Sequence, residues 1–155
     1  MAPNVTLVPY DRDYLDLSYD WLHDPEIKAM AMAPNFTRED QEAFFAGLSE
    51  RENYKVWGVA ADGRPIGAGG IKNISGRDGE FWCYIGEREY WGKGIGGRIL
   101  ELCEEKAREL GVTRLTMTAL ETNERSLNAY RKAGFELLSR DEAEGTITLE
   151  KQLEP

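Results

Sequence analysis

Hydrophobic positions alternate in some segments of the chain and recur at helical spacing in others, and these two periods predict strands and helices. Strands are predicted at residues 5–10, in two runs within 54–74, at 80–86, at 113–120 and in two runs within 135–153. Helices are predicted in the segment after residue 10, at 23–32, at 35–48, from 95 to about 110, and at 123–134.

Turn and cap residues separate these segments. Asp62-Gly63 is a strong hairpin signal, and Thr37 with Asp40 three residues later is typical of a helix start. Gly111 follows the long helical pattern, as expected of a helix end. The pattern predicts one mixed α+β domain over residues 1–155, with about seven strands and about four helices.

Composition narrows the class of partner. The 155 residues suffice for one domain, and 28 acidic against 19 basic residues give a net charge of −9. This balance argues against nucleic acid and anionic membranes, because neutralising phosphates requires excess Lys and Arg. It leaves room for a cationic amine, although the charge can equally serve solubility alone.

The chain contains two cysteines, and its first residues lack the charged and apolar regions of a signal peptide. No apolar run approaches the roughly 18 residues of a membrane span. We therefore expect a soluble protein in a reducing, cytoplasmic compartment. No cluster of residues suggests a metal site.

The most informative stretch is "EYWGKGIGGRIL", in which four glycines, at positions 92, 94, 96 and 97, open a helical pattern. Glycines at a strand-to-helix turn let backbone N–H groups approach a phosphate. A Walker loop is excluded because Gly94, and not Ser or Thr, follows Lys93. A dinucleotide loop fits the letters and places Glu121 as a ribose ligand, but hairpin strands precede the loop where βαβ units should be.

A second motif lies downstream, in "TNERSLNAYRKAGF". Together the two motifs resemble the GCN5-related N-acetyltransferases, or GNAT family, over about residues 5–149. The coenzyme A loop of that family, Gln/Arg-x-x-Gly-x-Gly/Ala, corresponds here to residues 91–96, with Trp91 in place of the usual Gln or Arg. The second motif is matched by Asn123, Ser126, Tyr130, Lys132, Gly134 and Phe135.

The resemblance implies acetyl transfer from acetyl-CoA to a primary amine, on a sheet that splays between its fourth and fifth strands. Dimers are common in the family, so it also allows a homodimer. It implies that the glycine loop binds the pyrophosphate, that the free strand edge pairs with the pantetheine, and that an N–H near Ile85 binds the oxyanion. The implied cofactor-binding residues are Tyr84, Ile85, Gly86, Trp91, Gly92, Lys93, Gly94, Ile95, Gly96, Gly97, Asn123 and Ser126.

The resemblance also implies that Tyr130 is the general acid for the coenzyme A thiolate. By residue type alone, Tyr130 could simply pack its helix on the sheet. Glu80 is the candidate base, acting directly or through a water, or else a solvated acid at a strand start. Asn123 could be only a helix cap. Glu87 and Glu89 are expected at the surface, as is His23, the only histidine.

The acceptor is less constrained by the sequence. Trp21, Phe36 and Trp82 are expected to line the substrate site. The segment "YDWLHDPEIKAMAMAPNFTREDQEAFF" resembles acetyltransferases of nucleotide-linked amino sugars, ribosomal-protein N-termini and aminoglycosides. A small molecule, with an amino sugar first, is the preferred hypothesis. The alternatives are an Nα-acetyltransferase of protein N-termini and a non-catalytic coenzyme A-binding module.

Overall fold

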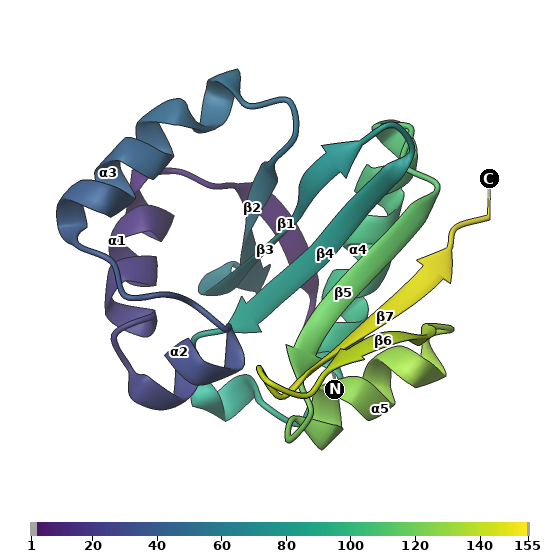
Figure 1. The fold of residues 1–155 in the computed structure, drawn as a ribbon. Coiled ribbons are helices and arrows are strands. Elements are labelled where there is room, and N and C mark those ends of the chain that lie inside the picture. Colours follow the sequence, from purple (N-terminus) through teal and green to yellow (C-terminus); the bar gives the residue numbers. More distant parts are fainter. Residues whose placement is uncertain (1–2, 155) are drawn as a thin grey trace.

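The computed structural model describes residues 3–154 and contains one seven-stranded sheet in the order β1-β2-β3-β4-β5-β7-β6 (Figure 1). Its strands are β1 (Val5–Pro9), β2 (Lys55–Ala61), β3 (Arg64–Ser75), β4 (Asp78–Ile85), β5 (Arg114–Leu120), β6 (Glu136–Asp141) and β7 (Thr146–Gln152). Neighbouring strands are antiparallel except β4 and β5, which run parallel. The predicted α+β class and mostly antiparallel sheet are confirmed.

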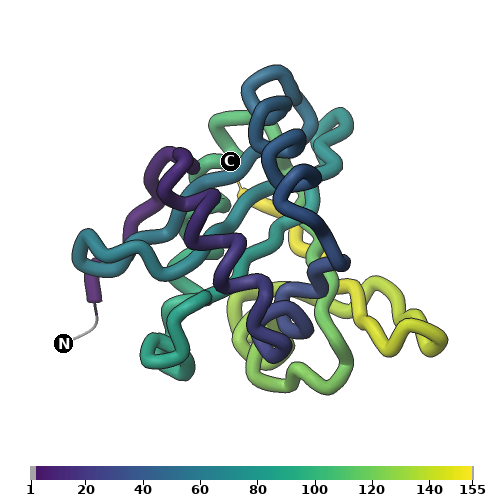
Figure 2. The backbone as a smooth tube through the Cα atoms, turned by 90° about the vertical axis from the view of Figure 1, so that its left-hand side faces the viewer, coloured from purple at the N-terminus to yellow at the C-terminus, as the bar shows by residue number. Residues whose placement is uncertain are grey.

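Helices cover both faces of the sheet. They are α1 (Arg12–Trp21), α2 (Pro25–Met30), α3 (Arg38–Gly47), α4 (Ile95–Glu109) and α5 (Glu124–Lys132), with short 3₁₀ turns η1 (Leu48–Glu50) and η2 (Arg88–Tyr90). The first three cover one face, which Figure 2 turns toward the viewer, and α4 and α5 cover the other. Each of the five segments in which the sequence pattern predicted a helix contains one of these α-helices.

The parallel pair β4 and β5 separates soon after it forms. Its register covers only Asp78 to Glu80 on β4, and beyond this point the two strands diverge (Figure 1). The remainder of β5 stays paired with β7 on its other side. The predicted splay is therefore present, and it leaves one edge of β4 without a strand partner after Glu80.

Local signals in the sequence explain several element boundaries. Thr37 and Asp40 form the reciprocal capping box at the start of α3. Asp62 and Gly63 both have positive φ, 49° and 82°, which a two-residue hairpin turn requires of its central residues. Because these features depend on near neighbours in the chain, the sequence was sufficient to place them.

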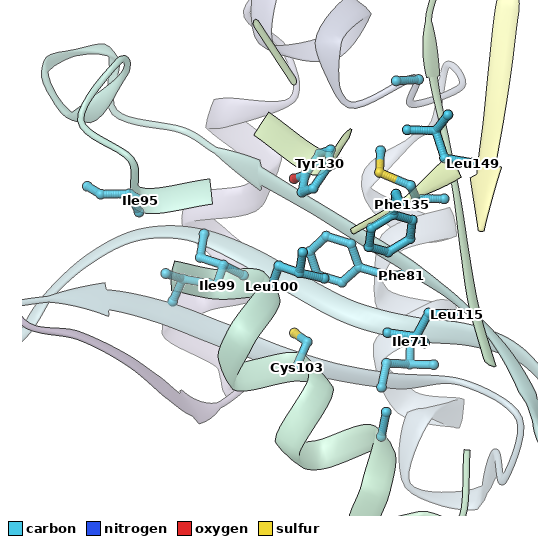
Figure 3. Packing of buried hydrophobic residues seen from close by; sticks show 14 of the residues in the cluster. Ile71, Phe81, Ile95, Ile99, Leu100, Cys103, Leu115, Tyr130, Phe135 and Leu149 are labelled. Atoms are coloured by element: carbon cyan, nitrogen blue, oxygen red, sulfur yellow. The ribbon is translucent and has the colours of Figure 1, made fainter. Parts of the chain in front are cut away.

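The main core lies between the sheet and the α4–α5 face. Figure 3 shows Phe81, Tyr130 and Phe135 packed together, with Ile99, Leu100 and Leu115 nearby. A second, smaller cluster lies on the other face, under α1 and α2, and includes Tyr14, Trp21, Ile27, Ala68 and Tyr84. The two faces of β4 thus belong to two different hydrophobic clusters.

The buried faces of two helices differ from the sequence prediction. In α1, the apolar spacing indicated Leu15, Tyr19 and Leu22, but the buried residues are Tyr14, Leu15, Ser18 and Trp21. In α3, Phe44, Phe45 and Leu48 are only half-buried, and the buried residue is Gln41. Gln41 Nε2 donates to the Leu15 carbonyl at 2.8 Å, so a polar contact attaches α3 to α1.

Candidate active site

The glycine loop begins α4 without a side-chain cap. Gly94 is the N-cap residue and, like Gly92, has positive φ, 76° and 74° respectively, where side-chain-bearing residues are strained. The first backbone N–H groups of a helix have no intrahelical acceptor. With no side chain to accept from them, the N–H groups of Ile95, Gly96 and Gly97 remain available to an anion.

These donors face a pocket of about 340 Å³, here termed the loop pocket. It lies where β4 and β5 have separated, between the glycine loop and the start of α5. Its lining residues are Ile27, Met30, Cys83, Tyr84, Ile85, Tyr90, Trp91, Gly92, Gly94, Ile95, Gly96, Gly97, Asn123, Arg125, Ser126, Ala129 and Tyr130.

Ten of the twelve residues implied as cofactor-binding line this pocket, and the exceptions are Gly86 and Lys93. The Gly86 N–H donates to the Ile66 carbonyl at 2.6 Å, so it belongs to the sheet. The Lys93 ammonium lies 6.0 Å from the Tyr90 ring centre. The positive charge in the lining is instead Arg125, which was not among the predicted cofactor-binding residues although it lies within the second motif.

Arg125 is close to the glycine loop. A Cβ built on Gly92 would have the Arg125 guanidinium nitrogen as its nearest neighbour, at 3.8 Å. Its neighbour Asn123 caps α5, accepting the Ser126 N–H at 3.4 Å, and lines the pocket as well. The start of α5 therefore adds a guanidinium to the N–H donors of α4, a combination that suits a phosphate-bearing ligand.

The free edge of β4 contributes backbone groups to the same space. Backbone groups of successive residues in a strand point to opposite edges. Since the Gly86 N–H bonds to β3, the groups of Ile85 and Cys83 face the diverging β5. The Ile85 carbonyl accepts the Trp91 indole N–H at 2.9 Å, which leaves the Ile85 and Cys83 N–H groups on that edge.

This contact gives a physical role to Trp91, the residue that departs from the family pattern. The indole bridges the glycine loop to the end of β4, and the Arg88 guanidinium lies 5.6 Å from its ring centre. Arg88 also pairs with Asp24 and Glu26 at the start of α2. Trp91 therefore fixes the loop relative to the strand edge.

Tyr130 comes from α5 and is buried beside Phe81 and Phe135. Its hydroxyl lies on the side of the ring away from Phe135 (Figure 3) and contacts Cys83 Sγ at 3.4 Å. Burial raises the pKa of Tyr130 well above its ordinary value, and burial also raises the pKa of the Cys83 thiol to about 11. Both groups therefore hold their protons at neutral pH, and Tyr130 can donate one into the loop pocket.

Glu80 is not part of this arrangement. Its carboxylate pairs with Lys72 at 3.4 Å and accepts from Asn73 at 3.5 Å. Cys83, which contacts Tyr130, is three residues further along β4, or roughly 10 Å at the usual strand rise. The structure thus separates the candidate base from the candidate acid.

A second pocket, of about 390 Å³ and here termed the aromatic pocket, lies on the α1–α3 face. It shares Tyr84 with the loop pocket. Its other lining residues are Tyr10, Ser18, Leu22, Ala31, Met32, Ala33, Pro34, Phe36, Asp40, Gln41, Phe44, Tyr54, Val56, Lys72 and Trp82.

Phe36 and Trp82, two of the three expected substrate-site residues, line the aromatic pocket. The third, Trp21, lines neither pocket: it packs over Gly86 in the second cluster, and its indole donates to Glu87 at 2.9 Å. Glu87 and Glu89, expected at the surface, both pair with Arg64. The remaining pocket residues come from separate segments, and no local motif signals that they meet.

Comparison with known proteins identifies the family. A sequence model described as the acetyltransferase (GNAT) domain matches residues 4–136. The chain belongs to this family and is an N-acetyltransferase that uses acetyl-CoA. No match was found among curated proteins.

Solved structures share the fold at low sequence identity. A spermidine N-acetyltransferase from Vibrio cholerae, in complex with CoA and spermine, is 15% identical with a TM-score of 0.85 over 96% of this chain and 95% of that chain. N-acetyltransferase PseH from Campylobacter jejuni is 18% identical with a TM-score of 0.72, covering 98% and 100%. An acetyltransferase from Salmonella typhimurium that modifies the N-terminal serine of ribosomal protein L7/L12 is 13% identical with a TM-score of 0.81, covering 97% and 95%.

Two further observations concern residues 3–154. No helix in this range has the length and apolar character needed to cross a membrane. In the same part of the chain, no three His, Cys, Asp or Glu side chains are grouped as a metal site requires.

Proposed function

We propose that the protein, as one acetyltransferase domain, acetylates the primary amine of a small molecule, with acetyl-CoA in the loop pocket and the acceptor in the aromatic pocket. The observation that carries the proposal is the shared wall at Tyr84, which brings the two pockets together beside the free edge of β4. Acetyl-CoA supplies the activated acetyl group. The glycine loop, Arg125 and the β4 edge would hold it.

The chain's own groups account for the proton movements. An acceptor ammonium must lose one proton before its nitrogen attacks the thioester carbonyl. As the N–C bond forms and the C–S bond breaks, the sulfur leaves as a thiolate and the nitrogen loses a second proton to water. The Tyr130 hydroxyl donates a proton to that sulfur and is reprotonated from solvent. The Ile85 N–H, on the free edge, would stabilise negative charge on the carbonyl oxygen.

Glu80 accepts the first of these two protons, the one lost by the acceptor ammonium, through a water molecule. Direct contact with the reacting nitrogen is disfavoured by the roughly 10 Å of strand between Glu80 and Cys83. The carboxylate nevertheless pairs with Lys72, which lines the aromatic pocket, so it lies close to that pocket. The strand thereby separates a base on the acceptor side from an acid on the cofactor side.

Thermal unfolding with and without acetyl-CoA tests the binding step, because a ligand of the native state raises the melting temperature. Thiol release with an amine panel tests the reaction. Tyr130→Phe should lower kcat by about 100-fold, within the usual range for a lost general acid, with little change in KM. Tyr19→Phe, which removes a hydroxyl outside both pockets, is the matched control.

Glu80→Gln should lower kcat/KM at neutral pH and recover as the pH rises, since the free amine then forms without a base. A melting temperature unaffected by acetyl-CoA would contradict the whole proposal. Stabilisation by acetyl-CoA without turnover of any amine would favour the non-catalytic module.

A further inference from the structure

The aromatic pocket has a composition that restricts its ligand. Six of its lining residues are aromatic: Tyr10, Phe36, Phe44, Tyr54, Trp82 and Tyr84. Trp82 and Tyr84 are stacked, with ring centres 6.2 Å apart and planes 19° apart. Flat apolar rings are therefore the main surface offered to a ligand.

The hydroxyl groups among these rings are largely occupied. Tyr10 and Tyr84 both donate to Ser18 Oγ, at 2.9 and 2.8 Å. Tyr54 carries the remaining tyrosine hydroxyl of the lining, and burial raises its pKa to about 12. The lining consequently offers few free partners for the many hydroxyls of a sugar, which would lose their hydrogen bonds to water on entering.

Among the described residues, only two charged side chains line this pocket, Asp40 and Lys72. Asp40 accepts the Thr37 N–H in the capping box of α3, at 2.9 Å. Lys72 pairs with Glu80. Asp40 keeps its single negative charge, which matches one ammonium and not the several of a polyamine, and Lys72, already paired with a carboxylate, is one cation against the two charges of a diphosphate. A single ammonium, by contrast, can be stabilised by the ring faces themselves.

We infer that the acceptor is an arylalkylamine, a monoamine joined by a short linker to one aromatic ring. This inference rests on the proposed function, and it names the substrate class of that same pocket. The ring of the substrate packs among Phe36, Phe44 and Trp82, while the amine reaches toward Tyr84 and the loop pocket. The amino sugars preferred from the sequence are then poor substrates, as are polyamines, aminoglycosides and peptide N-termini.

Initial rates of thiol release with acetyl-CoA test the inference directly. The panel contains 2-phenylethylamine, spermidine, kanamycin, glucosamine and a peptide with a free N-terminal serine. We expect 2-phenylethylamine to have the highest kcat/KM, by about tenfold or more, since ring burial contributes a kcal/mol or more. A higher kcat/KM for any other member would overturn the inference while leaving the acetyltransferase function intact.

Two variants on the same helix sharpen the test. Phe44 lines the aromatic pocket, whereas Phe45 does not and instead packs against Tyr10 and Arg12. Phe44→Ala should raise KM for 2-phenylethylamine by about tenfold and leave the acetyl-CoA affinity unchanged. Phe45→Ala should leave both values unchanged. Equal effects of the two variants on KM would contradict the inference, and loss of acetyl-CoA binding or of all amine turnover would instead contradict the proposed function.

Discussion

The two pockets on either side of β4 are built by different means. The loop pocket is formed largely by backbone: a glycine loop, the first turn of α4 and a free strand edge. The aromatic pocket is formed by side chains from α1, α3, the segment between α2 and α3, and the strands. Backbone donors serve one constant ligand, whereas side chains can be exchanged without rebuilding the sheet. On the proposed assignment of acetyl-CoA to the loop pocket and the amine to the aromatic pocket, this difference lets one fold keep its cofactor and vary its acceptor.

The strongest test of a backbone-built site is a methyl group placed in it. A Cβ on Gly96 would lie 3.7 Å from the Tyr130 hydroxyl, in the loop pocket. Gly96→Ala should weaken acetyl-CoA binding by about 10- to 100-fold, as overpacking by 1–3 kcal/mol implies. The same change should raise the melting temperature of the free protein, because Ala is the better helix residue. Calorimetry gives both values. An unchanged affinity would show that acetyl-CoA does not closely approach the backbone at Gly96.

Arg125 supplies the positive charge in the lining of the loop pocket, whereas the nearby Lys93 does not line it. Substituting each residue in turn compares their contributions to acetyl-CoA binding. Arg125→Ala should lower acetyl-CoA affinity by about tenfold, the effect of losing one charge-assisted contact. Lys93→Ala should have a smaller effect, because Lys93 lies against Tyr90 outside the lining. Titrations at two salt concentrations measure the difference, and a reversed order would restore Lys93 as the phosphate ligand.

The aromatic pocket depends on the attachment of α3 to α1. Gln41→Leu removes the donor to the Leu15 carbonyl and should cost about 1 to 2 kcal/mol of unfolding free energy. Acceptor KM should rise while acetyl-CoA affinity stays constant, since Gln41 lines only the aromatic pocket. Urea unfolding and steady-state kinetics provide the two readouts. A loss of acetyl-CoA affinity would show that the pockets are not built independently.

Trp91→Phe retains an aromatic ring but removes the N–H donated to Ile85. The expected cost is about 1 kcal/mol of stability, typical of one hydrogen bond, with a modest loss of acetyl-CoA affinity. Thermal unfolding with and without acetyl-CoA measures both. A variant indistinguishable from the parent would show that the indole does not fix the glycine loop to the strand edge.

The smallest effect is expected from pH, because the stability of the folded state should change only in the alkaline range. Burial raises the pKa of Cys83 to about 11 and that of Tyr54 to about 12, so the folded state holds these protons more tightly than the unfolded chain. The resulting stability is complete below the unfolded thiol pKa of about 8.5 and is lost as pH rises through 11. Melting temperatures should be level to about pH 8.5 and then fall. Tyr54→Phe should reduce the decline at the highest pH.

The sequence predicted the loop pocket better than the aromatic one, and the reason is physical. The residues around Gly94 and Asn123 act through local backbone conformation, so each motif is contiguous and readable. Gln41, buried within an apparently amphipathic helix, and Trp21, placed in the core, depend on contacts between distant segments. Arg125 lies within the second motif, so it was visible in the sequence. Its position in the motif does not, however, distinguish a pocket-lining arginine from one that is exposed to solvent.

The common wall at Tyr84 has a thermodynamic consequence. Its ring belongs to both pockets, and its hydroxyl is fixed to Ser18 on α1. Any ligand in one pocket that changes the position of this ring changes the shape of the other. Such coupling is reciprocal: the factor by which acetyl-CoA improves the affinity for the amine equals the factor by which the amine improves the affinity for acetyl-CoA. On the proposed assignment of the two pockets, Tyr84 is therefore the side chain through which the two binding equilibria are coupled.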